Sequence, residues 1–303
     1  MRRVVVSGAT GAIGTALTKQ LVDQGVEVLV LCRKDSKRIK NIIESPLVKV
    51  KYCALNELVD VTNDTGNEYD VFYHFAWAGA AGPGRNDMYM QNNNVKYALD
   101  AVSVAKRFGC KKFIGAGSQA EYGRHEGLLK SETPTFPETG YGYAKLCAGQ
   151  MTRDYAHQIG IEHIWVRILS VYGPNDGAQS MVMSTINKLM NGEVPQFTKG
   201  EQLWDYLYSG DAANAFCLLG DKGVDGKTYV LGSGKSRPLS EYITIIRNEV
   251  NPSAKIELGA IPYGPKQVMH LQADIEELKK DTSFIPMMRF EDGIKNILKD
   301  YGE

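Results

Sequence analysis

Short apolar runs alternate with amphipathic stretches through the first half of the chain. The runs cover residues 2–8 (RRVVVSG), 26–32 (VEVLVLC), 69–76 (YDVFYHFA), 110–118 (CKKFIGAGS) and 161–169 (IEHIWVRIL). Between them, 13–25 and 92–109 carry apolar residues at helical spacing, and each stretch ends in glycine. The runs are continuously apolar, which is typical of strands that are buried on both faces. The pattern therefore predicts an α/β fold, with a parallel sheet covered by helices on both sides.

The composition argues against a nucleic-acid-binding, membrane or metal-binding protein. The 303 residues carry 35 basic and 35 acidic side chains, and a zero formal charge argues against nucleic-acid or membrane-surface partners. No apolar run approaches the roughly 20 residues that a membrane-spanning helix needs, and the start, MRRVVVSGAT, is too short for a signal peptide. The five cysteines and five histidines show no paired spacing. We therefore predict reduced thiols, no metal site and a cytoplasmic location.

A glycine-rich loop follows the first predicted strand. The segment VVVSGATGAIGTAL places Gly8, Gly11 and Gly14 between that strand and the first predicted helix. Such glycines allow a tight turn and let the backbone approach a pyrophosphate, which the helix N-terminus then binds. The loop therefore predicts a dinucleotide site.

This site implies a doubly wound sheet of the Rossmann type, with a smaller C-terminal region over the carboxyl ends of the strands, where ligands bind. Beyond about residue 169 the alternation loosens, and proline and glycine become frequent. We predict a dinucleotide-binding domain over 1–168 together with about 205–232. The predicted substrate domain covers 169–204 and 233–303.

The end of the second strand bears on the choice of cofactor. An acidic residue there would bind the ribose hydroxyls of NAD. This chain has Cys32 instead, followed by Arg33, Lys34 and Arg38. Cations attract a ribose 2′-phosphate, so we predict NADP, with NAD as the alternative. A solvated basic loop would also explain these residues.

Residues 138–149 (ETGYGYAKLCAG) hold a candidate acid. On a helix, residues four apart share a face, so Lys145 would lie beside Tyr141 and turn away from Tyr143. A nearby ammonium favours the phenolate, which tyrosine otherwise forms only near pH 10. Ser118 lies just beyond the end of a predicted strand. The spacing therefore predicts Tyr141 as a general acid or base beside the nicotinamide position.

These residues make a Ser…Tyr-x-x-x-Lys set, and the chain resembles the extended short-chain dehydrogenase/reductases, in the NAD-dependent epimerase/dehydratase branch that acts on nucleotide sugars. The resemblance runs nearly from end to end, through SGATGAIG, HFAWAG, NNNV, GSQAEYG, YGYAK, RILSVYGP, WDYLYSGDAANA and KTYVLGSG in the family's order. It implies that Tyr141 exchanges a proton with a sugar oxygen, that Lys145 also holds the nicotinamide ribose, and that Ser118 hydrogen-bonds the sugar.

Together the loop and the resemblance predict two residue sets. The cofactor set is Gly8, Thr10, Gly11, Ala12, Ile13, Gly14, Arg33, Lys34, Arg38, Leu55, Phe75, Ala76, Asn94, Tyr141 and Lys145. The substrate set is Trp77, Ser118, Glu121, Tyr141, Ser170 and Arg237. A core position for Trp77, a structural contact for Glu121 and a solvated side chain for Arg237 are the alternatives.

The reaction class follows from departures from the family pattern. Dehydratases of the family carry an Asp-Glu pair directly after the serine, where this chain has Gln119 and Ala120. We therefore expect no dehydration. An exchangeable NADP fits net reduction, so the prediction is a reductase of 4-keto sugar nucleotides, acting at C4. The alternatives are a C4-epimerase with tightly bound NAD and a non-catalytic NADP-binding regulator, which the intact trio disfavours. The family also makes a homodimer an option.

Overall fold

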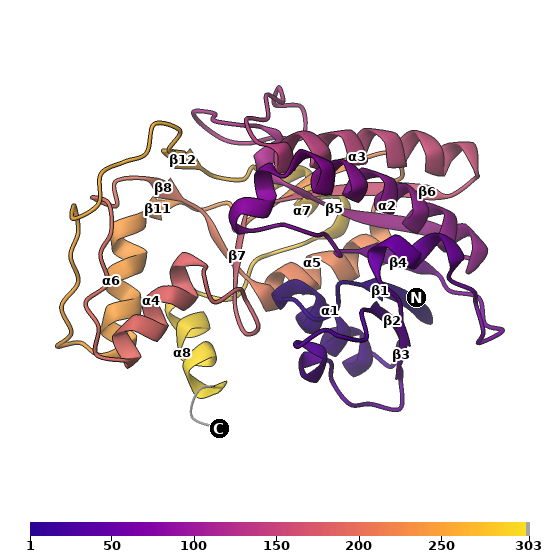
Figure 1. Ribbon diagram of the computed structural model, residues 1–303, viewed down its shortest axis with the longest axis horizontal. Coiled ribbons are helices and arrows are strands. Elements are labelled where there is room, and N and C mark those ends of the chain that lie inside the picture. Colours follow the sequence, from indigo (N-terminus) through magenta and orange to yellow (C-terminus); the bar gives the residue numbers. More distant parts are fainter. Residues whose placement is uncertain (301–303) are drawn as a thin grey trace.

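The computed structural model describes residues 1–300, and its main element is a seven-stranded sheet in which every neighbouring pair is parallel (Figure 1). The strand order is β10-β6-β5-β4-β1-β2-β3. The strands are β1 (Arg3–Ser7), β2 (Glu27–Cys32), β3 (Val48–Tyr52), β4 (Val71–His74), β5 (Lys112–Ser118), β6 (Glu162–Ile168) and β10 (Thr228–Leu231). The order reverses direction at β1, which is the switch point where ligands of such sheets bind. The predicted fold class is confirmed.

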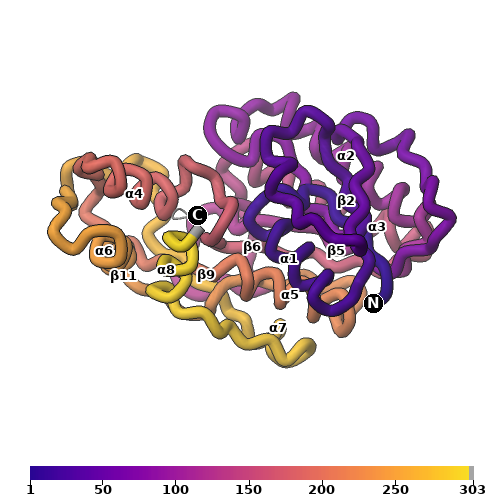
Figure 2. Tube along the Cα trace, turned by 90° about the horizontal axis from the view of Figure 1, so that it is seen from below, coloured from indigo at the N-terminus to yellow at the C-terminus, as the bar shows by residue number. Residues whose placement is uncertain are grey.

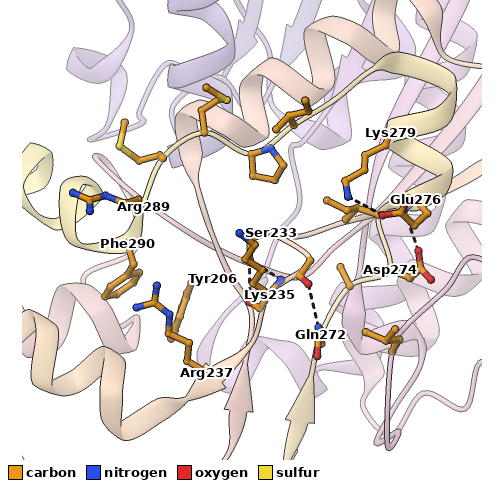
Figure 3. Close-up of a pocket in the computed structure, with 18 of the residues that line it drawn as sticks. Tyr206, Ser233, Lys235, Arg237, Gln272, Asp274, Glu276, Lys279, Arg289 and Phe290 are labelled. Carbon is orange, nitrogen blue, oxygen red and sulfur yellow. Dashed lines mark hydrogen bonds and ion pairs between the residues drawn. The ribbon is translucent and has the colours of Figure 1, made fainter.

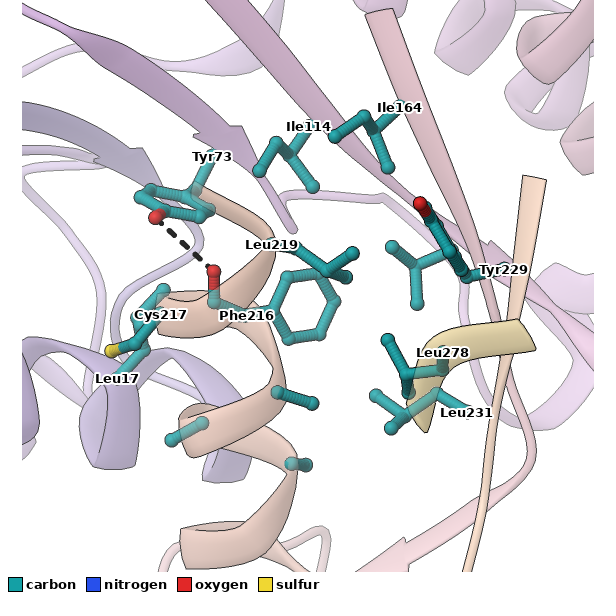
Figure 4. Packing of buried hydrophobic residues seen from close by; sticks show 14 of the residues in the cluster. Leu17, Tyr73, Ile114, Ile164, Phe216, Cys217, Leu219, Tyr229, Leu231 and Leu278 are labelled. Atoms are coloured by element: carbon teal, nitrogen blue, oxygen red, sulfur yellow. Dashed lines mark hydrogen bonds between the residues drawn. The ribbon is translucent and has the colours of Figure 1, made fainter. Parts of the chain in front are cut away.

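Helices cover both faces of this sheet. On one face lie α1 (Ala12–Asp23), α5 (Ser209–Lys222) and α7 (Glu276–Thr282), and on the other lie α2 (Met88–Arg107) and α3 (Gly140–Gln158). In the first core, Tyr73 packs edge-on against Phe216 and donates a hydrogen bond of 3.2 Å to its carbonyl oxygen (Figure 4). In the second core, Phe72 stacks on Phe113. Burial on both faces explains the continuously apolar strands.

Helix starts follow from capping side chains. Asp87 accepts a hydrogen bond from the Met90 N–H, so α2 begins earlier than the predicted residue 92. Thr139 accepts one from the Gly142 N–H and begins α3, which carries Tyr141. These two helices pack side by side along the sheet (Figure 1).

The later chain forms a second, smaller core. Figure 2 shows α4 (Met181–Met190), α6 (Leu239–Val250) and α8 (Phe290–Asp300) gathered at the end of the molecule away from α2 and α3. Their buried side chains include Ile186, Ile246 and Ile294. Short strands join this region to the main sheet: β7 (Ser170–Tyr172), β8 (Leu203–Trp204), β9 (Tyr206–Tyr208), β11 (Arg237–Pro238) and β12 (His270–Leu271). Short 3-10 helices occur at Ile39–Asn41, Leu55–Asp60, Gly82–Asn86 and Gln119–Glu121.

Helix α7 departs from the predicted division of the chain. It lies within 233–303, yet it packs against α5 and β10 of the large sheet, because Ile275 and Leu278 are buried in the same core as Leu231. Among the described residues, no helix is long and apolar enough to cross a membrane. The same part of the chain holds no cluster of side chains suited to a metal ion.

Candidate active site

The segment from Gly8 to Gly14, which runs from the end of β1 into the first turn of α1, has no room for side chains at two of its three glycines. A Cβ on Gly8, whose φ is +80°, would lie 2.6 Å from the backbone nitrogen of Ala76. A Cβ on Gly14 would lie 2.4 Å from the carbonyl oxygen of Gly8. At Gly11 the nearest atom would be 3.9 Å away. Gly8 and Gly14 therefore shape the turn, whereas Gly11 leaves the start of α1 open to a ligand.

Two cavities meet at this loop. The cofactor cavity has a volume of about 780 Å³ and extends to Cys32 and Leu55, and the catalytic cavity has about 440 Å³ and extends to Ser118 and Tyr141. Their shared lining residues are Gly8, Gly11, Arg38, Phe75, Trp77 and Ala80. Within residues 1–300, no side chain caps the N-terminus of α1, so its first N–H groups are free for an anion. The cleft therefore fits a dinucleotide with its pyrophosphate at α1.

Most predicted cofactor residues line these two cavities. They are Gly8, Thr10, Gly11, Ala12, Ile13, Gly14, Arg33, Arg38, Leu55, Phe75, Ala76, Tyr141 and Lys145. Lys34 is exposed and is not one of the described lining residues. Asn94 is buried, and its amide accepts a hydrogen bond of 3.0 Å from the Ala78 N–H and donates one of 2.8 Å to the Ala78 carbonyl oxygen. The prediction that Asn94 binds the cofactor is wrong, because both ends of its amide hold the cavity wall instead.

Arg38 connects two loops across the cleft. Its guanidinium donates a hydrogen bond to the carbonyl oxygen of Asn175, a residue with φ of +63° in the loop after β7. Arg38 and Asn175 both line the catalytic cavity. Arg33 is exposed at the far end of the cofactor cavity, 3.9 Å from Asp35. Arg38 therefore forms part of the wall of the cleft, while Arg33 is the freer cation.

The predicted catalytic trio converges on the catalytic cavity. Ser118 ends β5 and lines the catalytic cavity together with Tyr141, which lies in the first turn of α3. Lys145 lies one turn later on the same face, whereas Tyr143 points outward with 54% of its surface exposed. Trp77 meets the Tyr141 ring edge-on at 6.1 Å. The backbone geometry thus brings together the groups that the four-residue spacing selected.

The charges around Tyr141 differ from the expected ones. The Lys145 ammonium donates a hydrogen bond of 2.7 Å to the Ala116 carbonyl oxygen and lies 3.6 Å from the centre of the Trp77 ring. Burial lowers the pKa of Lys145 to about 7. Burial also raises the pKa of Tyr141, and the Ser118 hydrogen bond and the charge of Arg85 oppose this rise. Arg85 is thus a second cation beside the phenol, whereas the Lys145 ammonium is directed at Ala116 and Trp77.

Glu121 does not face the cleft. It is fully buried, and its carboxylate accepts hydrogen bonds from the Ser118 N–H (2.8 Å), the Trp165 Nε1 (3.0 Å) and the Arg167 Nε (2.8 Å). The predicted contact with substrate is wrong, and the structural alternative is correct. The short distance in sequence from Ser118 suggested a shared site, but Glu121 points into the interior and holds the end of β5.

Two further predicted substrate residues also have other partners. The Ser170 hydroxyl accepts a hydrogen bond of 2.8 Å from Trp204 Nε1, while its neighbours Leu169 and Val171 line the catalytic cavity. Arg237 lines a different cavity of about 480 Å³, which shares no described lining residue with the other two (Figure 3). There it forms an ion pair of 2.9 Å with Glu291. Neither side chain is placed to contact a group in the catalytic cavity.

Sequence reasoning missed Arg85 and Gln91. The Arg85 guanidinium lies 4.2 Å from the centre of the Tyr141 ring and lines the catalytic cavity. The buried Gln91 amide donates hydrogen bonds to the carbonyl oxygens of Gly79 (3.1 Å) and Gly84 (2.7 Å) and accepts one from Trp77 Nε1 (2.8 Å). Arg85 stands in a glycine-rich stretch without periodicity, so no pattern selected it. Gln91 directly precedes the NNNV motif, and this position was the one feature of the sequence that could have pointed to Gln91.

Comparisons with known proteins agree with this arrangement. The model of the NAD dependent epimerase/dehydratase family matches residues 4–232. The chain is 28% identical to a UDP-glucuronate 4-epimerase of Thermodesulfobacterium geofontis, over 96% of this chain and 93% of the relative. It is 23% identical to an ADP-L-glycero-D-manno-heptose-6-epimerase of Pseudomonas paraeruginosa, over 96% of each chain.

Solved structures share the fold. A UDP-glucose 4-epimerase of Thermotoga maritima superimposes with a TM-score of 0.88 at 19% identity, over 99% of this chain and 100% of the other. A UDP-N-acetylglucosamine 4-epimerase of Methanobrevibacter ruminantium gives 0.87 at 22% identity, over 99% of each chain. With its parallel sheet, its glycine loop and the Ser118, Tyr141 and Lys145 side chains in one cavity, the chain belongs to the NAD-dependent epimerase/dehydratase family, and it is an enzyme of the short-chain dehydrogenase/reductase type.

Proposed function

We propose that the protein is a nucleotide-sugar 4-epimerase that keeps NAD bound. The observation that carries the proposal is the meeting of Ser118, Tyr141 and Lys145 in one cavity that also reaches the glycine loop. The sequence alone favoured an NADP-dependent reductase, but the named relatives favour its alternative. Arg38, one of the three cations behind the NADP prediction, is in addition engaged with Asn175.

The proposed chemistry needs one proton carrier and one hydride carrier. Bound NAD would supply a reversible acceptor for the hydride from C4. Tyr141, as phenolate, takes the proton of the C4 hydroxyl, and Ser118 donates a hydrogen bond to the same oxygen. Once the sugar has turned within the cavity, Tyr141 would return the proton to the same oxygen, and the configuration at C4 would be inverted. The reaction has no net consumption of cofactor. Trp77 supplies a flat wall beside Tyr141.

The bridge between Arg38 and Asn175 supports retention of the cofactor. It joins the loop after β2 to the loop after β7, so a dinucleotide along α1 would lie beneath a hydrogen bond that must break for release. Retention suits an epimerase, because the hydride must return to the same sugar. We propose further that the region of 169–204 and 233–303 holds the nucleotide part of the substrate.

A reductase acting on 4-keto sugar nucleotides is the second candidate. The observation in its favour is the end of β2, where Cys32 replaces an acidic ribose ligand and the exposed Arg33 lines the cofactor cavity. A 2′-phosphate could pair with Arg33 there. This candidate predicts a protein that is isolated without cofactor and consumes added NADPH.

One experiment separates the candidates. The purified protein is denatured, and the released dinucleotide is identified by mass spectrometry. Native protein is then incubated with UDP-, dTDP-, CDP- and GDP-sugars without added cofactor, and the configuration at C4 is followed by NMR. We expect released NAD and interconversion of the two C4 epimers. In a parallel incubation with NADPH and a 4-keto sugar nucleotide, NADPH-dependent loss of the keto sugar would support the reductase. Cofactor binding without turnover of any of these sugars would support the non-catalytic regulator.

We also propose a homodimer. Tyr143, Cys147 and Met151 follow one another at four-residue spacing along the outer face of α3, and all three are exposed. Such an apolar stripe is suited to packing against a second copy. Analytical ultracentrifugation should give a dimer for the wild type and a monomer for Met151→Glu, while Lys188→Glu on α4 serves as the control. A wild-type monomer at micromolar concentration would contradict the proposal.

A further inference from the structure

Two cations lie near the Tyr141 ring, and the nearer one is not the lysine of the trio. The Arg85 Cζ is 4.2 Å from the ring centre, whereas the Lys145 Nζ is 5.7 Å away. Lys145 is instead directed at the Ala116 carbonyl oxygen and at the Trp77 ring. An arginine also remains charged at every physiological pH, which a buried lysine does not.

The loop that carries Arg85 is held firmly. Gln91 binds the carbonyl oxygens on both sides of it, at Gly79 and Gly84. Arg85 itself donates a hydrogen bond of 2.9 Å to the Ala80 carbonyl oxygen. Asn86 accepts one of 3.1 Å from the N–H of Gly140, the residue before Tyr141. The loop is thereby fixed to the first turn of α3, and the guanidinium is set over the ring.

The charge of Arg85 is not neutralised locally. Among residues 1–299, no carboxylate forms an ion pair with it, and it lines the catalytic cavity. The other charged groups around the phenol are Lys145 and Glu121, and Glu121 is itself paired with Arg167 at 2.8 Å. A phenolate delocalises its charge into the ring, so a cation over the ring face is attracted more strongly to the ionised form than to the neutral one.

We propose that Arg85 is a positioning residue that stabilises the Tyr141 phenolate through the face of its ring, so that the acid/base of this site works with two cations. The inference rests on the proposed role of Tyr141, and it assigns to Arg85 a contribution that the Ser-Tyr-Lys set does not contain. In this arrangement Lys145, which donates a hydrogen bond to the Ala116 carbonyl oxygen, contacts the cofactor rather than the phenol.

The test titrates the phenol directly and needs no sugar substrate. Protein labelled with [¹³Cζ]tyrosine and saturated with NAD⁺ is followed by NMR against pH, and the Tyr141 signal is identified by its loss in Tyr141→Phe. The variant Arg85→Gln should raise the Tyr141 midpoint by about one to two pH units, the shift that a charge at about 5 Å gives between the water and protein limits. Arg85→Lys should restore part of this shift, because it keeps the charge but loses the flat stack.

The matched control is Arg153→Gln. It removes an arginine from the later part of α3, away from the Tyr141 ring, and should leave the Tyr141 midpoint unchanged. An equal midpoint in wild type and Arg85→Gln would overturn the inference. A Tyr141 signal that does not titrate below about pH 11 in the wild type would overturn it too. Because the readout uses no turnover, a protein that fails to epimerise sugars but shows the shift would refute the proposed function alone.

Discussion

Replacing Glu121 with glutamine tests whether this carboxylate is structural. The change keeps the shape of the side chain and removes its charge, which leaves the Arg167 guanidinium buried without its anion; the exposed fractions of the two side chains are 6% for Arg167 and 1% for Glu121. Breaking a buried ion pair in this way costs about 3 kcal/mol or more. For a chain of 303 residues, this corresponds to a fall in Tm of about 5 °C.

Urea unfolding and calorimetry measure this cost. Glu126→Gln, at an exposed glutamate close by in sequence, is the control and should stay within about 0.5 kcal/mol of the wild type. The double variant Glu121→Gln/Arg167→Met should recover much of the loss, because neither charge is then buried alone and the glutamine oxygen still accepts from Ser118 and Trp165. A double-mutant cycle then isolates the coupling between the two side chains.

The same variant affects the active site indirectly. The glutamine oxygen can still accept the hydrogen bond from the Ser118 N–H, but without the carboxylate charge this bond is weaker. The end of β5 is then held less firmly, which should lower kcat by about tenfold while KM for the nucleotide sugar changes little. The reverse result would refute the structural assignment: an unfolding free energy equal to that of the wild type, together with a raised KM, would mean that Glu121 binds the sugar.

Three further predictions follow from the site and the core. Tyr141→Phe should reduce turnover by about 10²- to 10⁴-fold and leave NAD affinity nearly unchanged, which calorimetric titration would check. Gly14→Ala should destabilise the fold, because its Cβ would lie 2.4 Å from the Gly8 carbonyl oxygen. Gly11→Ala should fold normally and weaken dinucleotide binding. Unfolding curves and titrations with NAD distinguish the two effects. Burial lowers the pKa of His163 to about 3, so the unfolded chain gains a proton that the folded protein does not. His163 should therefore cost up to about 1.4 kcal/mol of stability per pH unit as pH falls from about 6.5 toward 3, and His163→Gln should show a shallower pH dependence in urea unfolding.

Local patterns were sufficient for the fold and for the trio. Continuous apolar runs depend only on burial on both faces, and the four-residue spacing of Tyr141 and Lys145 depends only on the helix, so both can be read without knowing the tertiary structure. The glycine loop is equally local. The contacts of Glu121 are not local. Its partners Trp165 and Arg167 come from β6, and the sequence near Glu121 contains no sign of them.

Cations were harder to place than glycines, because a long side chain reaches partners that its own segment does not specify. Arg237 was expected at the substrate; it pairs with Glu291 in a separate cavity, inside the region proposed to hold the nucleotide part, so its contact with substrate stays a prediction. Arg85 was not selected, although it contacts the ring of the predicted acid, because its loop takes its shape from the Gln91 amide rather than from any repeat.

The position of Arg38 changes the meaning of the basic stretch after β2. Read as sequence, Arg33, Lys34 and Arg38 form one cationic group suited to a 2′-phosphate. In the structure they separate: Arg33 lines the cofactor cavity, Lys34 is directed to solvent, and Arg38 holds the Asn175 carbonyl oxygen across the cleft. In the proposed function, this hydrogen bond must break before a dinucleotide along α1 can leave, and slow release suits an epimerase, because the hydride must return to the same sugar. The residue that supported NADP in the sequence thus supports retained NAD in the fold, and Arg38→Ala should convert slow release of the bound dinucleotide into fast release, as measured by dilution into excess labelled NAD. Release that is equally slow in this variant would remove the structural argument for retention.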